Sequence, residues 1–300
     1  MANANNMMVH PRIGVIGGRG QVAQLMVKRL EAVYQEVFLY TMDDFSDHLF
    51  EQPLDTIDLF VVCVDGFQSE KIVSTLQRNA SRAKILDVSP AYRESPEWVY
   101  GLTHANAGLI YGAKLVANPG CFATAALILL QPLLDASIIS YDQDLLISAI
   151  GGYTTGGHKL ISKHESNDSG EPLVEIYNFG SEHRHISEIR RVTGLTGQLI
   201  ITPIIGPHAR GTHVHMIVPN TDRSLYDIFN TRYQRSNDIE VYLGKKTYRP
   251  DEMAFNQGAR VFINQGQSYN VVTCQMDNLF KGAVSQAMDN IKLMLAKKEL

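Results

Sequence analysis

The chain has 300 residues, of which 45% are hydrophobic, so it is long enough for two domains of ordinary size. Its formal net charge is −4 and its Lys and Arg residues are scattered, which argues against nucleic acid as a partner. Three widely spaced cysteines, Cys63, Cys121 and Cys274, argue against a disulfide framework and a structural zinc site and favour a reducing compartment.

The sequence also gives no sign of a segment that enters a membrane. No stretch reaches the uninterrupted apolar length of a membrane span. The opening residues, MANANNMMVHPR, are polar and lack the apolar centre of a secretory signal. We therefore expect a soluble, cytoplasmic protein with no membrane among its partners.

The first predicted unit is a strand, a glycine turn and a helix in residues 12–30, RIGVIGGRGQVAQLMVKRL. Gly18, Gly20 and Ala23 fit the pattern G-x-G-x-x-A, which indicates dinucleotide binding when it lies between a strand and a helix. Small residues let the backbone approach a pyrophosphate, and the helix start supplies N–H donors. The alternative is a tight turn that binds nothing. The residues expected to contact a cofactor are Gly17, Gly18, Arg19, Gly20, Gln21 and Val22.

The end of the second predicted strand, residues 37–41, bears on the choice of cofactor. It finishes at Tyr40-Thr41 without an acid at the position that usually binds the ribose of NAD, and Asp43 and Asp44 lie just beyond. Arg19 in the turn has the charge to meet a 2′-phosphate, or is simply solvated. The pattern therefore favours NADP(H).

Two further apolar segments, residues 59–64 and 84–89, are separated by the helical stretch 69–80. Strands that alternate with helices indicate a parallel sheet covered on both faces.

Residues 118–136, NPGCFATAALILLQPLLDA, place one cysteine between a turn and an apolar helix. Regular structure pauses at Asn-Pro-Gly, and the helix is expected to begin at Cys121. Unpaired N–H groups and the helix dipole favour an anion there, so we expect a lowered thiol pKa and a nucleophilic thiolate. The alternative is a small hydrophobe packed under the turn.

After Cys121 the pattern changes to strands joined by long polar or glycine-rich connections, as in a mixed sheet. The predicted strands are residues 145–152, 199–206, 212–219, 239–243 and 270–276. A last helix, about residues 279–297, is expected to return to the first domain. We therefore assign residues 1–120 and 279–300 to a dinucleotide-binding domain, and residues 121–278 to a catalytic, substrate-binding and oligomerisation domain.

The segment GSEHRHISEIRR, residues 180–191, concentrates His183, Arg184, His185 and Glu188 within six positions. A nucleophilic thiol needs a group that takes its proton and later returns one, and histidine does this near neutral pH. The alternatives are a metal-ligand pair or a basic surface patch, but further clustered ligands for a metal are missing. A second group has structural or substrate-facing roles in our interpretation: His208, His213 and His215.

Taken in order, these segments resemble the N-acetyl-gamma-glutamyl-phosphate reductases, which are related to the aspartate-semialdehyde dehydrogenases. The motifs that carry the resemblance are the turn at 17–23, DVSPAYR at 87–93, YGLTH at 100–104, NPGCFATAA at 118–126, HRHISEI at 183–189, RGTHVHMIVP at 210–219 and DNLFKGAVSQA at 277–287. The resemblance implies an α/β protein with an N-terminal Rossmann-type, doubly wound parallel sheet. A C-terminal α+β catalytic domain with a mixed sheet should follow.

The activity that the resemblance implies is NADPH-dependent reduction of N-acetyl-gamma-glutamyl phosphate to the semialdehyde, with release of phosphate, in arginine biosynthesis. Cys121 would be the nucleophile that forms a thioester, His185 the base and Glu188 the group that orients it, although His183 stays a second candidate for the base. A homodimer or homotetramer without a metal is implied. The remaining cofactor residues would be Ser89, Asn278 and Gly282, and the substrate residues Arg93, Asn118, His158, His183, Arg184 and Arg210.

The segment Thr154-Thr155-Gly156-Gly157-His158 departs from the family, which usually has Ser-Gly-Ala-Gly-Arg there. Histidine at neutral pH is a weaker partner for an anion than the always-charged arginine. The same chemistry on an aminoadipyl, carrier-bound or aspartyl phosphate therefore stays an alternative. So does a non-catalytic cofactor-binding homologue, against which the intact Cys121 and His185 count.

Overall fold

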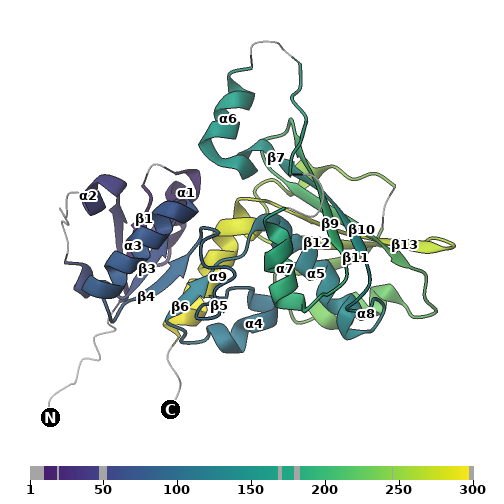
Figure 1. The fold of residues 1–300 in the computed structure, drawn as a ribbon, viewed down its shortest axis with the longest axis horizontal. Helices are drawn as coiled ribbons and strands as arrows, with labels where there is room; N and C mark the ends of the chain where they lie inside the picture. The colour runs from purple at the N-terminus through teal and green to yellow at the C-terminus, as the bar shows by residue number, and fades with distance from the viewer. Residues whose placement is uncertain are drawn as a thin grey trace.

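The structure, a computed structural model, describes residues 10–18, 20–46, 53–167, 171–178, 183–244 and 246–296. Arg19, which the sequence analysis assigns to the cofactor, lies outside these residues, as do residues 297–300. Figure 1 shows two sheets side by side, with the yellow C-terminal helix α9 (Ser285–Leu295) beside the first of them.

The first sheet is built from short apolar segments that all run in the same direction. The strands pair in the order β2-β1-β3-β4-β6-β5, and every pair is parallel. Their bounds are β1 (Arg12–Ile16), β2 (Glu36–Tyr40), β3 (Leu59–Val62), β4 (Lys84–Asp87), β5 (Val99–Tyr100) and β6 (Leu115–Ala117). All of β3 is buried, as expected for a central strand with both faces covered. The predicted doubly wound parallel sheet is confirmed.

Alternation along the strands divides the sheet into two apolar faces. Ile13 and Val15 of β1 face one core, with helices α1 (Gln21–Glu31), α4 (Thr103–Ile110) and α9. Phe60 and Val62 of β3 face the other, with α3 (Gly66–Asn79). The shorter elements here are α2 (Met42–Ser46) and η1 (Leu54–Thr56). Helix α9 contributes Ala287, Ile291 and Met294 to the first core.

Helix α5 (Cys121–Asp135) leads from the first sheet to the second and is buried on nearly all sides. Pro132 lies inside it and has no N–H to donate to the carbonyl of Ile128. The Tyr233 hydroxyl donates to that carbonyl instead, at 2.7 Å. A side chain of α8 (Leu225–Tyr233) thereby satisfies a backbone group that the proline leaves unpaired.

The second sheet is mixed, as predicted, with the strand order β11-β12-β13-β10-β7-β9-β8. Its strands are β7 (Leu145–Gly152), β8 (Glu175–Ile176), β9 (Leu199–Gly206), β10 (Thr212–Pro219), β11 (Ile239–Leu243), β12 (Ala259–Asn264) and β13 (Tyr269–Met276). The sequence analysis missed β8 and β12. Buried residues alternate along β9, because one face packs on α5 and on α7 (His185–Thr193).

Four short elements remain among the described residues. They are η2 (Tyr153–Gly156), α6 (Gly157–Glu165), η3 (Pro250–Met253) and the π-helical turn η4 (Phe280–Val284), which begins the C-terminal helix. The sequence analysis expected one uninterrupted helix here. Within the described ranges, no helix combines the length and the apolar character needed to cross a bilayer.

The packing of α9 gives a stability prediction. Ile291 is fully buried in the first core, so Ile291→Ala should lower the free energy of unfolding by about 2–5 kcal/mol. Urea unfolding followed by circular dichroism measures this change. The matched control is Lys292→Ala, one residue on and exposed, which should change the stability by less than about 0.5 kcal/mol. Equal effects of both variants would contradict the assignment of α9 to this core.

Candidate active site

Cys121 is the first residue of α5, directly after strand β6 and the turn 118–120. The N-cap residue is Gly120, and no side chain caps the helix, so the first backbone N–H groups remain available near the thiol. A side chain at Gly120 would overlap the ring of His185 and the guanidinium of Arg93. The turn therefore brings the backbone before Cys121 directly against the predicted base.

His185 and Glu188 form the pair that the sequence analysis predicted. They lie one turn apart on α7, and His185 Nδ1 is 2.7 Å from Glu188 Oε2. A carboxylate at Nδ1 keeps the proton on that nitrogen and leaves Nε2 as the ring nitrogen that accepts one. Both side chains are almost completely buried, so the ring is held in one orientation.

Glu188 is a buried carboxylate with several donors around it. Its Oε1 accepts from the Tyr100 hydroxyl at 2.6 Å and from the Gly120 N–H at 2.8 Å. Its Oε2 faces His185 and lies 3.5 Å from Arg93 Nη1. Burial alone would raise the pKa of Glu188, but Arg93, His185 and the Gly120 N–H outweigh it and lower the pKa to about 2. Glu188 is therefore ionised at neutral pH.

The expectation of a lowered thiol pKa is wrong for this structure. Burial raises the pKa of Cys121, although Arg184, the Phe122 N–H and Arg93 act in the opposite direction. Burial also lowers the pKa of His185, against the influence of Glu188. At neutral pH the pair is therefore a neutral thiol and a neutral imidazole. The neutral imidazole can accept a proton. The N-terminus of α5 does not by itself ionise the Cys121 thiol.

His183 contacts His185 but has a different set of neighbours. Its ring lies 5.0 Å from that of His185 and 5.6 Å from that of Tyr177, between centroids. Nδ1 of His183 accepts from the His185 N–H at 3.3 Å, and burial lowers its pKa to about 4. Since His183 lacks a carboxylate partner of the kind that orients His185, the geometry favours His185 as the base.

A cavity of about 400 Å³ opens beside the thiol, between η2, α6 and the start of α7. Its lining includes Lys159 and Arg184, whose side chains make no ion pair with any residue that the structure describes. Tyr177 and Arg184 line it and both interact electrostatically with Cys121, which is not itself one of the lining residues. The arrangement suits a substrate with an anionic group.

A larger cavity of about 840 Å³ lies between the glycine turn and the second sheet. Five of the predicted cofactor residues line it, namely Gly17, Gly18, Gly20, Gln21 and Val22. At Gly17 φ is +117°, and a side chain there would overlap the Cys63 carbonyl. Helix α1 has no side-chain N-cap, so its first N–H groups face this space. Lys159 lines both cavities and marks where they meet.

His158 lines the larger cavity and is absent from the lining of the one beside the thiol. The structure therefore places His158 beside the predicted cofactor residues, whereas its predicted place was the substrate site. Asp43, beyond the second strand, lines the same cavity, whereas Asp44 accepts from the N–H and hydroxyl of Thr41.

Three predicted substrate residues have other partners in the structure. Arg93 donates from Nε to the Asn118 carbonyl at 2.9 Å and from Nη2 to the Val88 carbonyl at 3.1 Å. Asn118 is fully buried and donates to the Ala283 carbonyl at 3.2 Å. Arg210 pairs with Asp277 at 2.9 Å. These groups hold the turn and the helix ends in place, and only Arg184 of the predicted arginines lines the substrate cavity.

The other predicted cofactor residues also have structural contacts. The Ser89 hydroxyl donates to Asp87 at 2.7 Å and is buried at the end of β4. Asn278 accepts from the Gly211 N–H at 2.9 Å and donates to the Thr154 hydroxyl at 2.8 Å. Gly282 packs against Cys121 so closely that a side chain would overlap the cysteine Cβ. Gly282 therefore borders Cys121, and Leu279, three residues earlier, lines the cavity of about 840 Å³.

The second histidine group lies apart from the thiol cavity. His213 and His215 alternate along β10, with rings 5.3 Å apart, and burial lowers the pKa of both. His208 lies 3.2 Å from the Gly211 carbonyl. Across the ranges that the structure covers, no three His, Cys, Asp or Glu side chains are grouped so that they could hold a metal ion.

Sequence reasoning missed several residues of the site. Tyr100 was noted only within a motif, yet it donates to Glu188. Lys159 directly follows the segment that departs from the family. A positive charge two residues after Gly156-Gly157 could have indicated that this residue belongs to the site. Tyr177 and Asn178 stand in a polar connection without any distinguishing local pattern.

Comparison with known proteins agrees with this architecture. The model of the family "Semialdehyde dehydrogenase, dimerisation domain" matches residues 121–278, more than half of the chain, which places the protein among the semialdehyde dehydrogenases. The structure of aspartate semialdehyde dehydrogenase II from Vibrio cholerae has the same fold. Its TM-score is 0.76 at 15% identity, over 95% of this chain and 98% of that chain.

Two curated relatives give a narrower assignment. The N-acetyl-gamma-glutamyl-phosphate reductase of Burkholderia cenocepacia is 30% identical over 81% of this chain and 83% of its own length. The enzyme of the same name from Brucella anthropi is 29% identical over 81% and 85%. The chain belongs to the N-acetyl-gamma-glutamyl-phosphate reductase family. The resemblance stated from the motifs is confirmed, and with it the enzyme class, an oxidoreductase.

The contacts of Glu188 predict how stability depends on pH. Its pKa is about 2 in the folded protein and about 4.5 ordinarily, so its contribution is complete above pH 4.5 and is lost as the pH falls towards 2. Glu188→Gln should destabilise the protein at pH 7 by about 3–5 kcal/mol, because the Arg93 charge stays buried without its partner. The stability of the variant should also fall less steeply between pH 4.5 and 3.

Urea unfolding at a series of pH values measures both effects. Glu97→Gln removes an exposed carboxylate elsewhere in the chain and serves as the control, with an expected change of less than about 0.5 kcal/mol. If the free energy of unfolding of Glu188→Gln falls as steeply with decreasing pH as that of the wild type, a group other than Glu188 is responsible for the loss of stability in acid.

Proposed function

We propose that the protein reduces N-acetyl-gamma-glutamyl phosphate to N-acetyl-glutamate semialdehyde, with release of phosphate and NADPH as the reductant. One observation carries the proposal above the others. A cysteine at an uncapped helix start lies beside an oriented His185–Glu188 pair, at a cavity with unpaired cationic side chains that adjoins the dinucleotide cavity. The names of the relatives support the choice of substrate.

The first half of the proposed reaction uses the thiol and the histidine. His185 Nε2 takes the proton of Cys121 as Sγ attacks the acyl carbon, and the C–O bond to phosphate breaks. The product on the enzyme is a thioester, and inorganic phosphate leaves. The raised pKa of Cys121 gives His185 a specific task, because the thiolate forms only as the proton moves to the imidazole. The resulting imidazolium is stabilised by the ionised Glu188 at 2.7 Å.

The second half converts the thioester into an aldehyde. When bound at the cavity lined by Gly17, Gly18 and Gly20, NADPH would supply the hydride that brings the thioester to the oxidation level of the aldehyde. The first backbone N–H groups of α5, which no side chain caps, would stabilise the negative oxygen that develops on the substrate. His185 returns its proton as the C–S bond breaks, so that the aldehyde leaves and the thiol is restored. Lys159 and Arg184 would bind the carboxylate and phosphate of the substrate, at the cavity they line.

The dinucleotide cavity fits such a cofactor. Gly17 lies in a backbone conformation that favours glycine, and a side chain there would overlap the Cys63 carbonyl, so at this position only glycine leaves the backbone open to the cavity. Gly20 precedes α1 without a side-chain cap, and the first turn of α1 has no acid to repel a pyrophosphate. For NADP(H) in particular, His158 and Lys159 bring basic side chains to this cavity.

The family also supports a proposal for the oligomeric state, the cellular compartment and the pathway. The name of the matching family model supports a homo-oligomer, and we propose a homodimer or homotetramer built through residues 121–278. The three cysteines are unpaired, in keeping with a reducing cytoplasm. We place the reaction in arginine biosynthesis, as the relatives' names imply.

A second candidate keeps the chemistry but takes another acyl phosphate. Thr155 lines the substrate cavity where the family usually has glycine, so the acyl group meets extra bulk there. Turnover of an aminoadipyl or aspartyl phosphate in preference to the N-acetyl-glutamyl compound would support this candidate. Phosphate-dependent reduction of NADP by a panel of semialdehydes distinguishes the two.

The nucleophile is tested by Cys121→Ser, which should abolish turnover while NADPH binding survives, because a serine hydroxyl lacks thiolate character. Cys274→Ala, in the core of the second sheet, is the control and should keep most of the activity. Iodoacetamide labelling of Cys121 should accelerate as the pH rises, since its thiol pKa is raised. Turnover by Cys121→Ser, or labelling confined to Cys63 or Cys274, would contradict the assignment.

The cofactor preference is tested by calorimetric titration of NADPH and NADH. We expect NADPH to bind more tightly, and His158→Gln to weaken NADPH binding by about tenfold while changing NADH binding much less. His10→Gln, at an exposed residue that does not line the cavity, controls for the loss of any histidine. Equal or tighter binding of NADH to the wild type would reject the preference and leave the fold assignment intact.

A further inference from the structure

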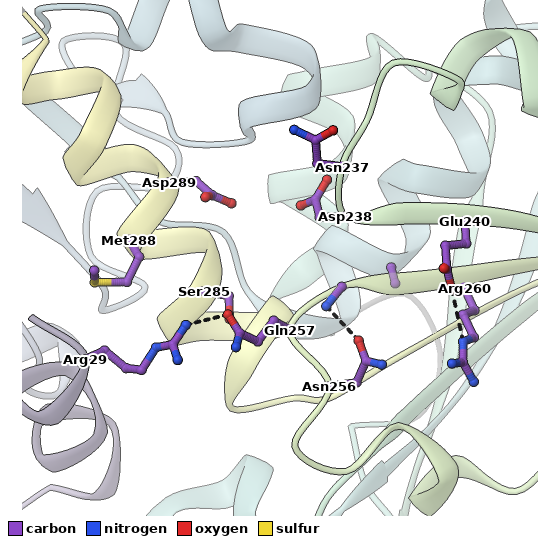
Figure 2. Close-up of a pocket in the computed structure, with 12 residues that line it drawn as sticks. Arg29, Asn237, Asp238, Glu240, Asn256, Gln257, Arg260, Ser285, Met288 and Asp289 are labelled. Atoms are coloured by element: carbon purple, nitrogen blue, oxygen red, sulfur yellow. Dashed lines mark hydrogen bonds and ion pairs between the residues drawn. The ribbon is translucent and has the colours of Figure 1, made fainter. Parts of the chain in front are cut away.

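A third cavity lies on another part of the junction between the sheets and shares none of the residues of the two described above. It has a volume of about 420 Å³ and is bounded by α1, by α9 and by the segments that lead into β11 and β12. Figure 2 shows the side chains that surround it. Those used below are Arg29, Asp238, Gln257, Ser285, Met288 and Asp289.

One end of this cavity is acidic. Asp238 and Asp289 lie close to each other in Figure 2, from the segment before β11 and from α9. The Asp238 carboxylate already binds the Nζ of Lys281 and the hydroxyl of Ser236. Asp289 makes no hydrogen bond or ion pair with any of the described residues, and burial raises its pKa. Lys281 and Lys292 act on Asp289 only through longer-range electrostatics, so its carboxylate oxygens keep the capacity to bind a cationic group directly.

The other end carries a positive charge. The guanidinium of Arg29 extends from α1 and donates to the side-chain oxygen of Gln257 (Figure 2). A guanidinium has five N–H donors, so this contact leaves donors for an anion. Met288 lies between Arg29 and Asp289 in the view and gives the wall between the two ends an apolar surface. A ligand in this space meets a negative charge at one end and a positive charge at the other.

Ser285 adds an independent sign that a ligand belongs here. It lines the cavity and is only 7% exposed, yet its hydroxyl has no hydrogen-bond partner among the described residues. A buried polar group without a partner is unfavourable, so such groups in native proteins call for an explanation. Ser285 and Asp289 are four residues apart on α9 and so lie on the same face of the helix.

We propose that this cavity binds a small zwitterion, a free amino acid being the simplest, through its ammonium group at Asp289 and its carboxylate at Arg29, with the Ser285 hydroxyl as a further hydrogen-bonding group. A ligand with only a positive charge would leave Arg29 without an opposite charge, and a ligand with only a negative charge would be repelled by Asp238 and Asp289. A metal ion is disfavoured, because the described side chains contain no group of three suitable ligands. The volume suits a ligand of this size.

The site is separate from the catalytic one but shares a structural element with it. Lys281 and Gly282 are consecutive residues of η4. Lys281 is fully buried and binds Asp238 of this cavity, while Gly282 packs against Cys121. The cavity also joins α1 and α9 of the first sheet to the edge of the second, so a bound ligand would contact both parts of the molecule.

The test is a screen of the twenty L-amino acids at millimolar concentration by thermal shift, followed by calorimetry of those that raise the melting temperature. Methylamine and acetate, which each carry one of the two charges, are titrated in parallel. We expect at least one amino acid to bind, and Asp289→Asn and Arg29→Gln each to weaken it by about tenfold or more. Ser285→Ala should weaken it by a smaller factor.

The controls are Glu31→Gln and Arg82→Gln, which remove exposed charges of the same kind outside the cavity and should leave the affinity unchanged. NADPH binding by each variant shows that it is folded. The proposal is overturned if no amino acid binds the wild type, or if Asp289→Asn and Arg29→Gln bind as tightly as the controls. Equally tight binding of methylamine or acetate alone would reject the zwitterion as the ligand class.

Discussion

The arrangement at the thiol depends on one buried carboxylate. Glu188 comes from α7, yet it accepts from the Gly120 N–H of the turn before Cys121, from Tyr100 of the first sheet and from His185 on its own helix. A buried charge of this kind is tolerated only when its hydrogen-bonding capacity is satisfied and an opposite charge lies near, here Arg93. The same contacts that keep Glu188 ionised therefore fix the distance between the nucleophile's helix and the base.

Two glycines make room for this arrangement. Gly120 gives the His185 ring access to the backbone before Cys121, and Gly282 brings η4 against the cysteine itself. The thiol is consequently partly buried between elements from three distant parts of the chain, and burial decides the direction of its pKa shift. The close contacts at Gly120 and Gly282 both bury the thiol and bring His185 near it. For this reason the pKa of the thiol is raised and the histidine is neutral and held in one orientation.

Local pattern was sufficient to predict the parts of the molecule whose interactions are close in sequence. The strand and glycine turn before α1, the start of α5 at Cys121 and the His185–Glu188 spacing are all of this kind. The thiol pKa was predicted with the wrong sign, because the helix start is local while the burial depends on Gly282, far along the chain. Arg93 and Arg210 were read as substrate ligands for a similar reason, since their partners are Glu188 and Asp277. The edge strand β8 is too short to produce a recognisable alternation.

The contact of α9 with the first sheet has a consequence for how the protein is made. Asn290 donates to the side chain of Asn118 at 2.9 Å and to the Gly101 carbonyl at 2.8 Å, and Ile291 and Met294 close one apolar face of the sheet. During synthesis at about 5–20 residues per second, the N-terminal sheet leaves the ribosome well before these residues do. Its open face must therefore wait for the whole second domain to be translated. The nascent chain carries this exposed surface for most of its synthesis, and the turn that presents the thiol gains its last support only when α9 docks.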